Sequence, residues 1–214
     1  MKTYLRKNIP HVTSRRFVIS VMISFLLLIA SIIINFYAGT FAAAKASNSV
    51  TDLVLDNIKV YNVTEIFIFG PLFMWIFVTI LCLKEPRRIP FVLKNIAFFV
   101  LIRSIFITMT HIGPYPDHLI LGYNTRLLTD FTFGGDLFFS AHTGLPFLMA
   151  LVFGKNIYLR IIFFCASVFF GAIVLMAHLH YTIDVLSAFF ITYTIYHIAK
   201  FLFRGDEKMF NEVV

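Results

Sequence analysis

Two short stretches of the chain carry the side chains best suited to chemistry. In the first, His178–Asp184, the residues His180 and Asp184 stand four positions apart inside an apolar run. A helix would place both on one face, where the carboxylate can reach the imidazole. A histidine oriented by a carboxylate is typical of a general base or a nucleophile. A carboxylate among apolar residues in a membrane segment is costly and usually functional, which favours chemistry at this pair.

The second stretch, Gly135–Thr143, supplies another histidine, His142. It lies in a turn of small residues, including Ser140 and Thr143, that opens a further apolar run. The unpaired N–H groups at the start of a helix favour an anion, and phosphate is the natural candidate. Any one histidine in an apolar protein is more often a hydrogen-bonded structural residue, so the argument for a site depends on the two stretches together.

The composition shows what kind of protein positions these residues. Hydrophobic residues make up 59% of the 214 residues, and 27 of them are phenylalanine; the mean hydropathy is +0.86. This composition excludes an ordinary soluble domain and indicates an integral membrane protein. The length allows one compact helical bundle, so we predict a single membrane domain over residues 1–214. No internal repeat and no nucleic-acid motif is present, and we expect no nucleic-acid partner.

A membrane-spanning helix needs about 20 mostly apolar residues. The sequence therefore predicts an all-α fold with six transmembrane helices, of which the fourth is short. The first run is too long for the apolar region of an ordinary signal peptide, and we interpret it as a retained anchor. The predicted spans lie near residues 17–38, 65–83, 91–111, 143–154, 157–177 and 181–203.

The net charge of +7 is best explained by topology. If the N-terminal segment 1–16 is cytoplasmic, most other Lys and Arg residues in the connections, and those of the tail 204–214, fall on the same side. We therefore predict that both termini are cytoplasmic and that the active site is extracytoplasmic or lumenal. Five of the seven histidines fall on that opposite side: His111, His118, His142, His178 and His180.

Both histidine stretches resemble signature motifs of a known family. They are similar to the third and fourth motifs of the sphingomyelin synthase family, a branch of the type 2 phosphatidic acid phosphatase superfamily. The segment Arg103–Thr110, followed by Gly113–Pro116, looks like the second motif. There are departures: the proline-rich acidic first motif is only echoed by Thr51–Asp56, and Ala141 stands where the family usually has glycine.

A further departure separates the branches of the superfamily. The wider superfamily places an arginine before its nucleophilic histidine, but Ile173 and Val174 occupy that region here. The missing arginine favours the synthase branch over generic phosphatases.

The resemblance implies a double displacement. His180 would attack the phosphorus of a membrane phospholipid and form a phosphohistidine, while Asp184 holds the ring. His142 would protonate the departing diacylglycerol oxygen and later deprotonate the acceptor. The transferred group would be of the phosphocholine or phosphoethanolamine type. The acceptor would be a lipid alcohol (ceramide or diacylglycerol) or water, and no metal or other cofactor is needed. Whether the chain forms a homo-oligomer stays open.

Several other residues are candidates for substrate binding. Arg103 could pair with phosphate oxygens, although a structural ion pair inside the membrane is an equal alternative. Asp136 could contact substrate or cap the catalytic turn. The full predicted set is Arg103, Asp136, Ser140, Thr143, His178 and Tyr181.

Three alternative functions remain at this stage. A lipid phosphatase or phospholipase C-type hydrolase would use the same histidines with water as acceptor. A metal-dependent hydrolase would use His111, His178, His180 and Asp184 as ligands. A channel or transporter would line a path with the charges inside the membrane.

Overall fold

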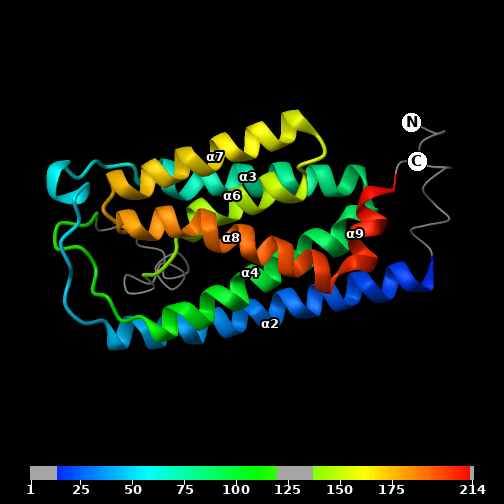
Figure 1. The fold of residues 1–214 in the computed structure, drawn as a ribbon, viewed down its shortest axis with the longest axis horizontal. Coiled ribbons are helices and arrows are strands. Elements are labelled where there is room, and N and C mark those ends of the chain that lie inside the picture. The colour runs from blue at the N-terminus through cyan, green and yellow to red at the C-terminus, as the bar shows by residue number, and fades with distance from the viewer. Residues whose placement is uncertain (1–13, 120–136, 213–214) are drawn as a thin grey trace.

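A computed structural model describes residues 14–119 and 137–212 of the chain. Within these ranges all regular structure is helical, which confirms the all-α prediction. Figure 1 shows an elongated bundle of long helices. The helices that are long and apolar enough to cross a membrane are α2 (Arg15–Lys45), α3 (Thr64–Lys84), α4 (Ile89–Met109), α7 (Ile157–Met176) and α8 (Thr182–Leu202).

The sixth predicted span corresponds to helix α6 (Ala141–Val152). It has 12 residues, so it is about 18 Å long, whereas the hydrocarbon core of a bilayer is about 30 Å thick. The described part of the chain thus contains five helices of spanning length, and six spans are not confirmed. Helix α6 instead lies inside the bundle, packed against α7, α8 and α4.

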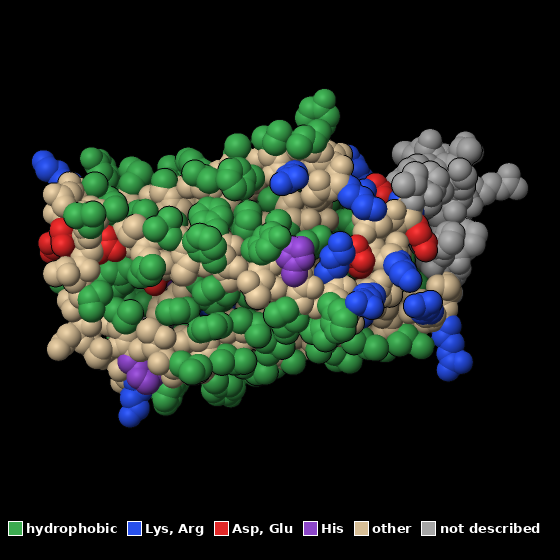
Figure 2. Space-filling model, in the orientation of Figure 1, with side chains coloured by type: hydrophobic (Ala, Val, Ile, Leu, Met, Phe, Trp, Pro, Cys, Tyr) green, Lys and Arg blue, Asp and Glu red, His purple; other side chains and the backbone are tan. Residues whose placement is uncertain are grey.

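The helices run back and forth between two ends of the bundle (Figure 1). At one end, which we call the site end, lie the connections 46–63, 110–119 and 177–181. Helix α2 begins at the other end, where α9 (Arg204–Asn211) also lies; we call it the α9 end. Apolar side chains cover the flank between the ends, and Lys and Arg side chains gather at the α9 end (Figure 2). On the face shown in Figure 2, the basic side chains thus concentrate at one end of the bundle, as the sequence predicted.

Short polar side chains define where several helices begin. The Ser14 hydroxyl accepts a hydrogen bond from the Phe17 N–H at 3.2 Å and caps α2. The Asn156 side chain accepts from the N–H groups of Tyr158 and Leu159 and caps α7. These acceptors satisfy N–H groups that have no partner within the helix, which is essential in an apolar environment.

Phenylalanine side chains build much of the core around α6. Phe99 of α4 and Phe139, just before α6, are both completely buried. Their rings meet edge to face, with centroids 5.4 Å apart, and Phe106 makes a second edge contact with Phe139 at 5.9 Å. Such contacts between rings favour one orientation. Phe139 therefore fixes the position at which the chain enters α6.

Gly144 allows α6 to approach its neighbours closely. A Cβ atom at this position would lie 2.7 Å from the ring of Phe99 and 2.9 Å from the Thr192 hydroxyl. Real side chains do not approach this closely, so any larger residue would push α6 away from α4 and α8.

We expect Gly144→Ala to destabilise the bundle by crowding Phe99. Overpacking of this kind costs about 1–3 kcal/mol, against a gain in helix propensity of up to about 1 kcal/mol. Thermal unfolding in detergent measures the change. Gly205→Ala is the control: among the described residues outside its own helix, an added methyl there would meet the end of the flexible Arg16 side chain, at 3.1 Å. Equal stability of the two variants would contradict the close-packing argument.

Candidate active site

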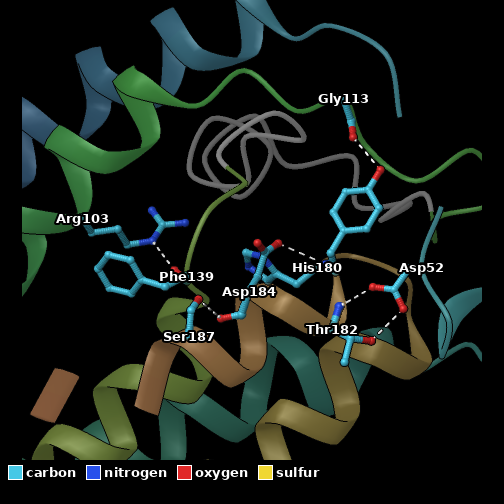
Figure 3. A network of polar contacts seen from close by, with 9 residues as sticks. Asp52, Arg103, Gly113, Phe139, His180, Thr182, Asp184 and Ser187 are labelled. Atoms are coloured by element: carbon cyan, nitrogen blue, oxygen red, sulfur yellow. Dashed lines mark hydrogen bonds and ion pairs between the residues drawn. The ribbon is translucent and has the colours of Figure 1, made fainter. Parts of the chain in front are cut away.

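His180 and Asp184 form the pair that their spacing predicts, but they do so in a turn. His180 lies in the connection before α8, and Asp184 lies in the first turn of that helix. The His180 Nδ1 and the Asp184 Oδ2 are 3.2 Å apart. Both residues are buried: His180 is 7% exposed and Asp184 is 1% exposed. The same Oδ2 accepts a hydrogen bond from the Tyr181 N–H at 3.0 Å. The carboxylate thus orients the histidine and caps the helix (Figure 3).

This contact determines which ring nitrogen of His180 is available for chemistry. A carboxylate accepts hydrogen bonds only, so the Nδ1 of His180 carries the proton that faces Asp184. In the neutral ring the Nε2 then keeps its lone pair. That nitrogen can act as a base or as a nucleophile.

The entry to α6 is held between α4 and α8. The backbone N–H of Ser140 donates to the Asp184 carbonyl at 3.0 Å. From the other side, the Nε of Arg103 on α4 donates to the Phe139 carbonyl at 3.4 Å. Arg103 is only 5% exposed. These two contacts bring the start of α6 to the His180–Asp184 pair, with the Arg103 guanidinium beside it (Figure 3).

His142 lies in the first turn of α6 and is partly exposed. Its ring stacks on the Phe67 ring of α3, with centroids 4.2 Å apart and planes 24° from parallel. Burial, followed by the nearby charges of His180 and Arg103, lowers the pKa of His142 to about 3. The structure therefore brings both predicted catalytic histidines, Asp184 and Arg103 together at the site end.

Two buried hydroxyls at the start of α6 have no partner among the described residues. The Ser140 hydroxyl is fully buried and makes no capping bond, although Ser140 occupies the N-cap position. The Thr143 hydroxyl is equally buried and packs beside Gly171 of α7. An unpaired buried hydroxyl costs about 1–3 kcal/mol. The Ser140 hydroxyl and the first N–H groups of α6 together suit an anion such as phosphate.

His178 lies in the α7–α8 turn with a strained backbone. Its φ is +53°, and it is the one non-glycine residue with positive φ in the part of the chain that the structure describes. It is 4% exposed, and neither ring nitrogen has a hydrogen-bond partner there. Its ring meets the Tyr115 ring edge to face at 5.0 Å. Burial lowers the pKa of His178 and outweighs the opposing charges of Asp117 and Asp52.

Tyr181 joins three segments of the site end. Its hydroxyl donates to the Gly113 carbonyl at 2.9 Å and accepts from the Val50 N–H at 3.2 Å. The Tyr181 hydroxyl is therefore both a hydrogen-bond donor and a hydrogen-bond acceptor within the protein. Contact of Tyr181 or His178 with a substrate stays a prediction.

The prediction for Asp136 is not tested, because Asp136 lies outside the described residues.

The described residues do not form the predicted alternative metal site. No three His, Cys, Asp or Glu side chains within residues 14–119 and 137–212 are grouped so that they could hold a metal ion. The alternative ligand set of His111, His178, His180 and Asp184 is therefore not assembled.

Asp52 contacts this region but was absent from the predicted site. Its carboxylate accepts hydrogen bonds from the N–H and hydroxyl of Thr182, the first residue of α8. Burial raises the pKa of Asp52, but hydrogen bonds from Thr182, Leu55 and Val54 outweigh it and lower the pKa below its usual value. The only signal in the sequence was the weak echo of an acidic motif at Thr51–Asp56.

A comparison with protein-family models finds a match over the part of the chain that carries both histidine stretches. Residues 134–201 match the family model described as PAP2 superfamily C-terminal. The match supports the type 2 phosphatidic acid phosphatase superfamily. It spans both histidine stretches and helices α6 to α8, but it does not identify the sphingomyelin synthase branch. No curated protein and no solved structure matches the chain. Members of this superfamily act on phosphate esters as phosphatases or phosphotransferases, which is consistent with an enzyme.

We expect Ser140→Ala not to lower the free energy of unfolding and to raise it by up to about 1–3 kcal/mol, because it removes a buried hydroxyl that has no hydrogen-bond partner among the described residues. Ser167→Ala is the matched control: the Ser167 hydroxyl is also fully buried but donates to the Thr143 carbonyl at 2.7 Å. Losing that bond should cost about 1 kcal/mol. Thermal unfolding in detergent compares the two variants. Equal destabilisation by both would show that Ser140 has a structural partner.

Proposed function

We propose that the chain is a lipid head-group phosphotransferase that works through a phosphohistidine on His180. The observation that carries this proposal is the buried His180–Asp184 pair, 3.2 Å from nitrogen to oxygen, beside the start of α6. A histidine held by a carboxylate next to an anion-binding helix end is suited to attack on a phosphate ester.

In the first half-reaction, the Nε2 of His180 attacks the phosphorus of a membrane phospholipid. A bond between nitrogen and phosphorus forms, and the bond from phosphorus to the diacylglycerol oxygen breaks. Burial favours the neutral ring of His142 in the free protein, but the negative charge of a bound phosphate ester favours its protonated form. In that form His142 gives its proton to the leaving oxygen. Asp184 stabilises the positive charge that develops on the His180 ring. Arg103 and the start of α6 face the negative charge on the phosphoryl oxygens.

In the second half-reaction, neutral His142 removes the proton from an acceptor hydroxyl. The acceptor oxygen attacks phosphorus, and the bond to the His180 nitrogen breaks. A lipid alcohol such as ceramide or diacylglycerol would give a new phospholipid; water would give a hydrolysis product. The similarity of the histidine stretches to sphingomyelin synthases favours a lipid acceptor. The superfamily match also accommodates a lipid phosphatase or phospholipase C-type hydrolase, which is the second candidate.

The site end would face the extracytoplasmic or lumenal side of the membrane. Support for this orientation comes from the basic side chains gathered at the α9 end (Figure 2), since cytoplasmic connections carry an excess of Lys and Arg. Both chain termini would then be cytoplasmic, and the phospholipid donor would come from the outer leaflet.

A trapping experiment tests the covalent intermediate. The purified protein is incubated with phospholipid labelled with ³²P, quenched in alkali and analysed for label on the protein. We expect alkali-stable, acid-labile label on the wild type and none on His180→Asn, with turnover at least about a thousandfold lower in that variant. His197→Asn is the control: His197 lies on α8 near the α9 end, and its ring contacts that of Tyr193 at a tilt of 54°, with centroids 4.4 Å apart. Label that persists in His180→Asn would rule out His180 as the nucleophile.

The products distinguish transfer from hydrolysis. The wild type is incubated in mixed lipid vesicles that contain a phospholipid donor and ceramide, and the products are identified by mass. A transferase yields diacylglycerol and a new sphingophospholipid in equal amounts. A hydrolase releases a water-soluble phosphate compound instead, and that outcome would replace the first proposal by the second.

A further inference from the structure

Asp52 lies in the connection between α2 and α3, far in sequence from the histidine stretches. It is 8% exposed, and its carboxylate accepts four hydrogen bonds. Two come from its own loop, from the N–H groups of Val54 at 2.9 Å and Leu55 at 3.1 Å. The other two come from Thr182, from its N–H at 2.6 Å and its hydroxyl at 2.7 Å. Asp52 thus binds one residue of a distant segment with both of its oxygens.

The position of Thr182 gives these contacts their importance. Thr182 is the first residue of α8 and stands midway between His180 and Asp184. Asp184 holds this turn from within, because its Oδ2 faces both the His180 ring and the Tyr181 N–H. Asp52 holds the same turn from outside, on the side of Thr182 (Figure 3). The turn is therefore fixed at consecutive backbone N–H groups, those of Tyr181 and Thr182, by two different carboxylates.

The loop that carries Asp52 is itself anchored. The Asp56 carboxylate accepts from the Asp52 N–H at 3.2 Å and from the Tyr115 hydroxyl at 2.7 Å. The Val50 N–H donates to the Tyr181 hydroxyl in the same region. The hydrogen bonds that lower the pKa of Asp52 keep it ionised at neutral pH, and bonds to an ionised acceptor are about twice as strong as neutral ones. Asp52 is therefore a rigid point of attachment for the first turn of α8.

We infer that Asp52 is a positioning residue that holds His180 and Asp184 in their reactive arrangement through Thr182. It does not need to touch the substrate. Its loss would let the turn before α8 rotate, so the ring nitrogen of His180 would more rarely face the phosphorus. This inference adds a supporting residue to the proposed function. Where turnover is measured, it rests on that proposed function.

The experiment compares variants at both ends of the contact in head-group transfer assays. Asp52→Asn keeps one acceptor oxygen and should lower kcat about tenfold with KM changed less than about twofold, which is the effect expected from weakening one charge-assisted hydrogen bond. Asp52→Ala should lower kcat about a hundredfold on the same scale. Thr182→Val loses only the hydroxyl and should lower kcat as much as Asp52→Asn does. Thr182→Ser keeps both donors and should have a kcat near that of the wild type.

Glu65→Gln is the control, because it changes an exposed carboxylate in the first turn of α3, near the same end of the bundle, without touching the Asp52 loop. It should keep kcat within about twofold of wild type while Asp52→Asn does not, as expected if the charge-assisted bonds to Thr182 matter. If Asp52→Ala does not fold, Asp52→Asn and Thr182→Val decide the question. Unchanged kcat in both of these variants, or an equal loss in Glu65→Gln, would overturn the inference.

A second readout does not depend on turnover. In protein with ¹⁵N-labelled histidine, the ring resonances of His180, assigned with His180→Asn, report on its contact with Asp184. We expect them to shift and broaden in Asp52→Asn and Thr182→Val, and to stay in place in Glu65→Gln and Thr182→Ser. If these shifts occur but the wild type acts on no phosphate ester, the proposed function fails and the positioning role stands. If the resonances stay unchanged in all variants, the positioning role fails.

Discussion

The site depends on one constraint: a carboxylate buried in an apolar bundle must have its hydrogen bonds satisfied. Asp184 is 1% exposed, so the groups around it in the protein must supply the hydrogen bonds that water would otherwise give. The fold meets the requirement with the His180 ring and the Tyr181 N–H on one oxygen. Because those groups must converge on the carboxylate, the turn before α8 has little freedom. The need to satisfy this buried carboxylate therefore fixes the direction of the His180 imidazole.

The local parts of this arrangement could be predicted from the sequence, and the distant parts could not. Five long apolar runs were sufficient to predict the five long helices. The four-residue spacing of His180 and Asp184 was sufficient to predict that their side chains meet. The short apolar run of α6 was also predicted, but as a sixth span. Its place inside the bundle was not, because apolarity alone does not separate a helix buried in protein from one that faces lipid. The bond between Asp52 and Thr182 joins residues 130 positions apart, and no periodicity encodes such a pairing. The positive φ of His178 likewise follows from how the connection must turn between two helices.

The two ends of the bundle treat polar groups differently. At the α9 end, Lys94 forms a buried ion pair with Asp206 at 2.6 Å and also donates to the Ser20 hydroxyl at 2.8 Å. This cluster joins α4, α9 and α2, and the charges compensate one another, which a buried pair needs in order to be tolerated. Some guanidinium nitrogens of Arg87 and Arg88, which pack near α9, are buried without a partner in the described chain, but both side chains form an ion pair with Glu85. At the site end, the hydroxyl of Ser140 and both ring nitrogens of His178 are buried with no partner at all among the described residues.

The residues of the candidate site lie both inside and outside the family match. His142, His180 and Asp184 lie within residues 134–201, but Phe67, Arg103 and Asp52, which contact or surround them, all lie before it. A fragment cut at the borders of the match would keep the two histidines and Asp184 and lose these supports. The site therefore needs the whole bundle, since its residues come from five segments of one chain: the connection before α3, then α3, α4, α6 and the turn into α8.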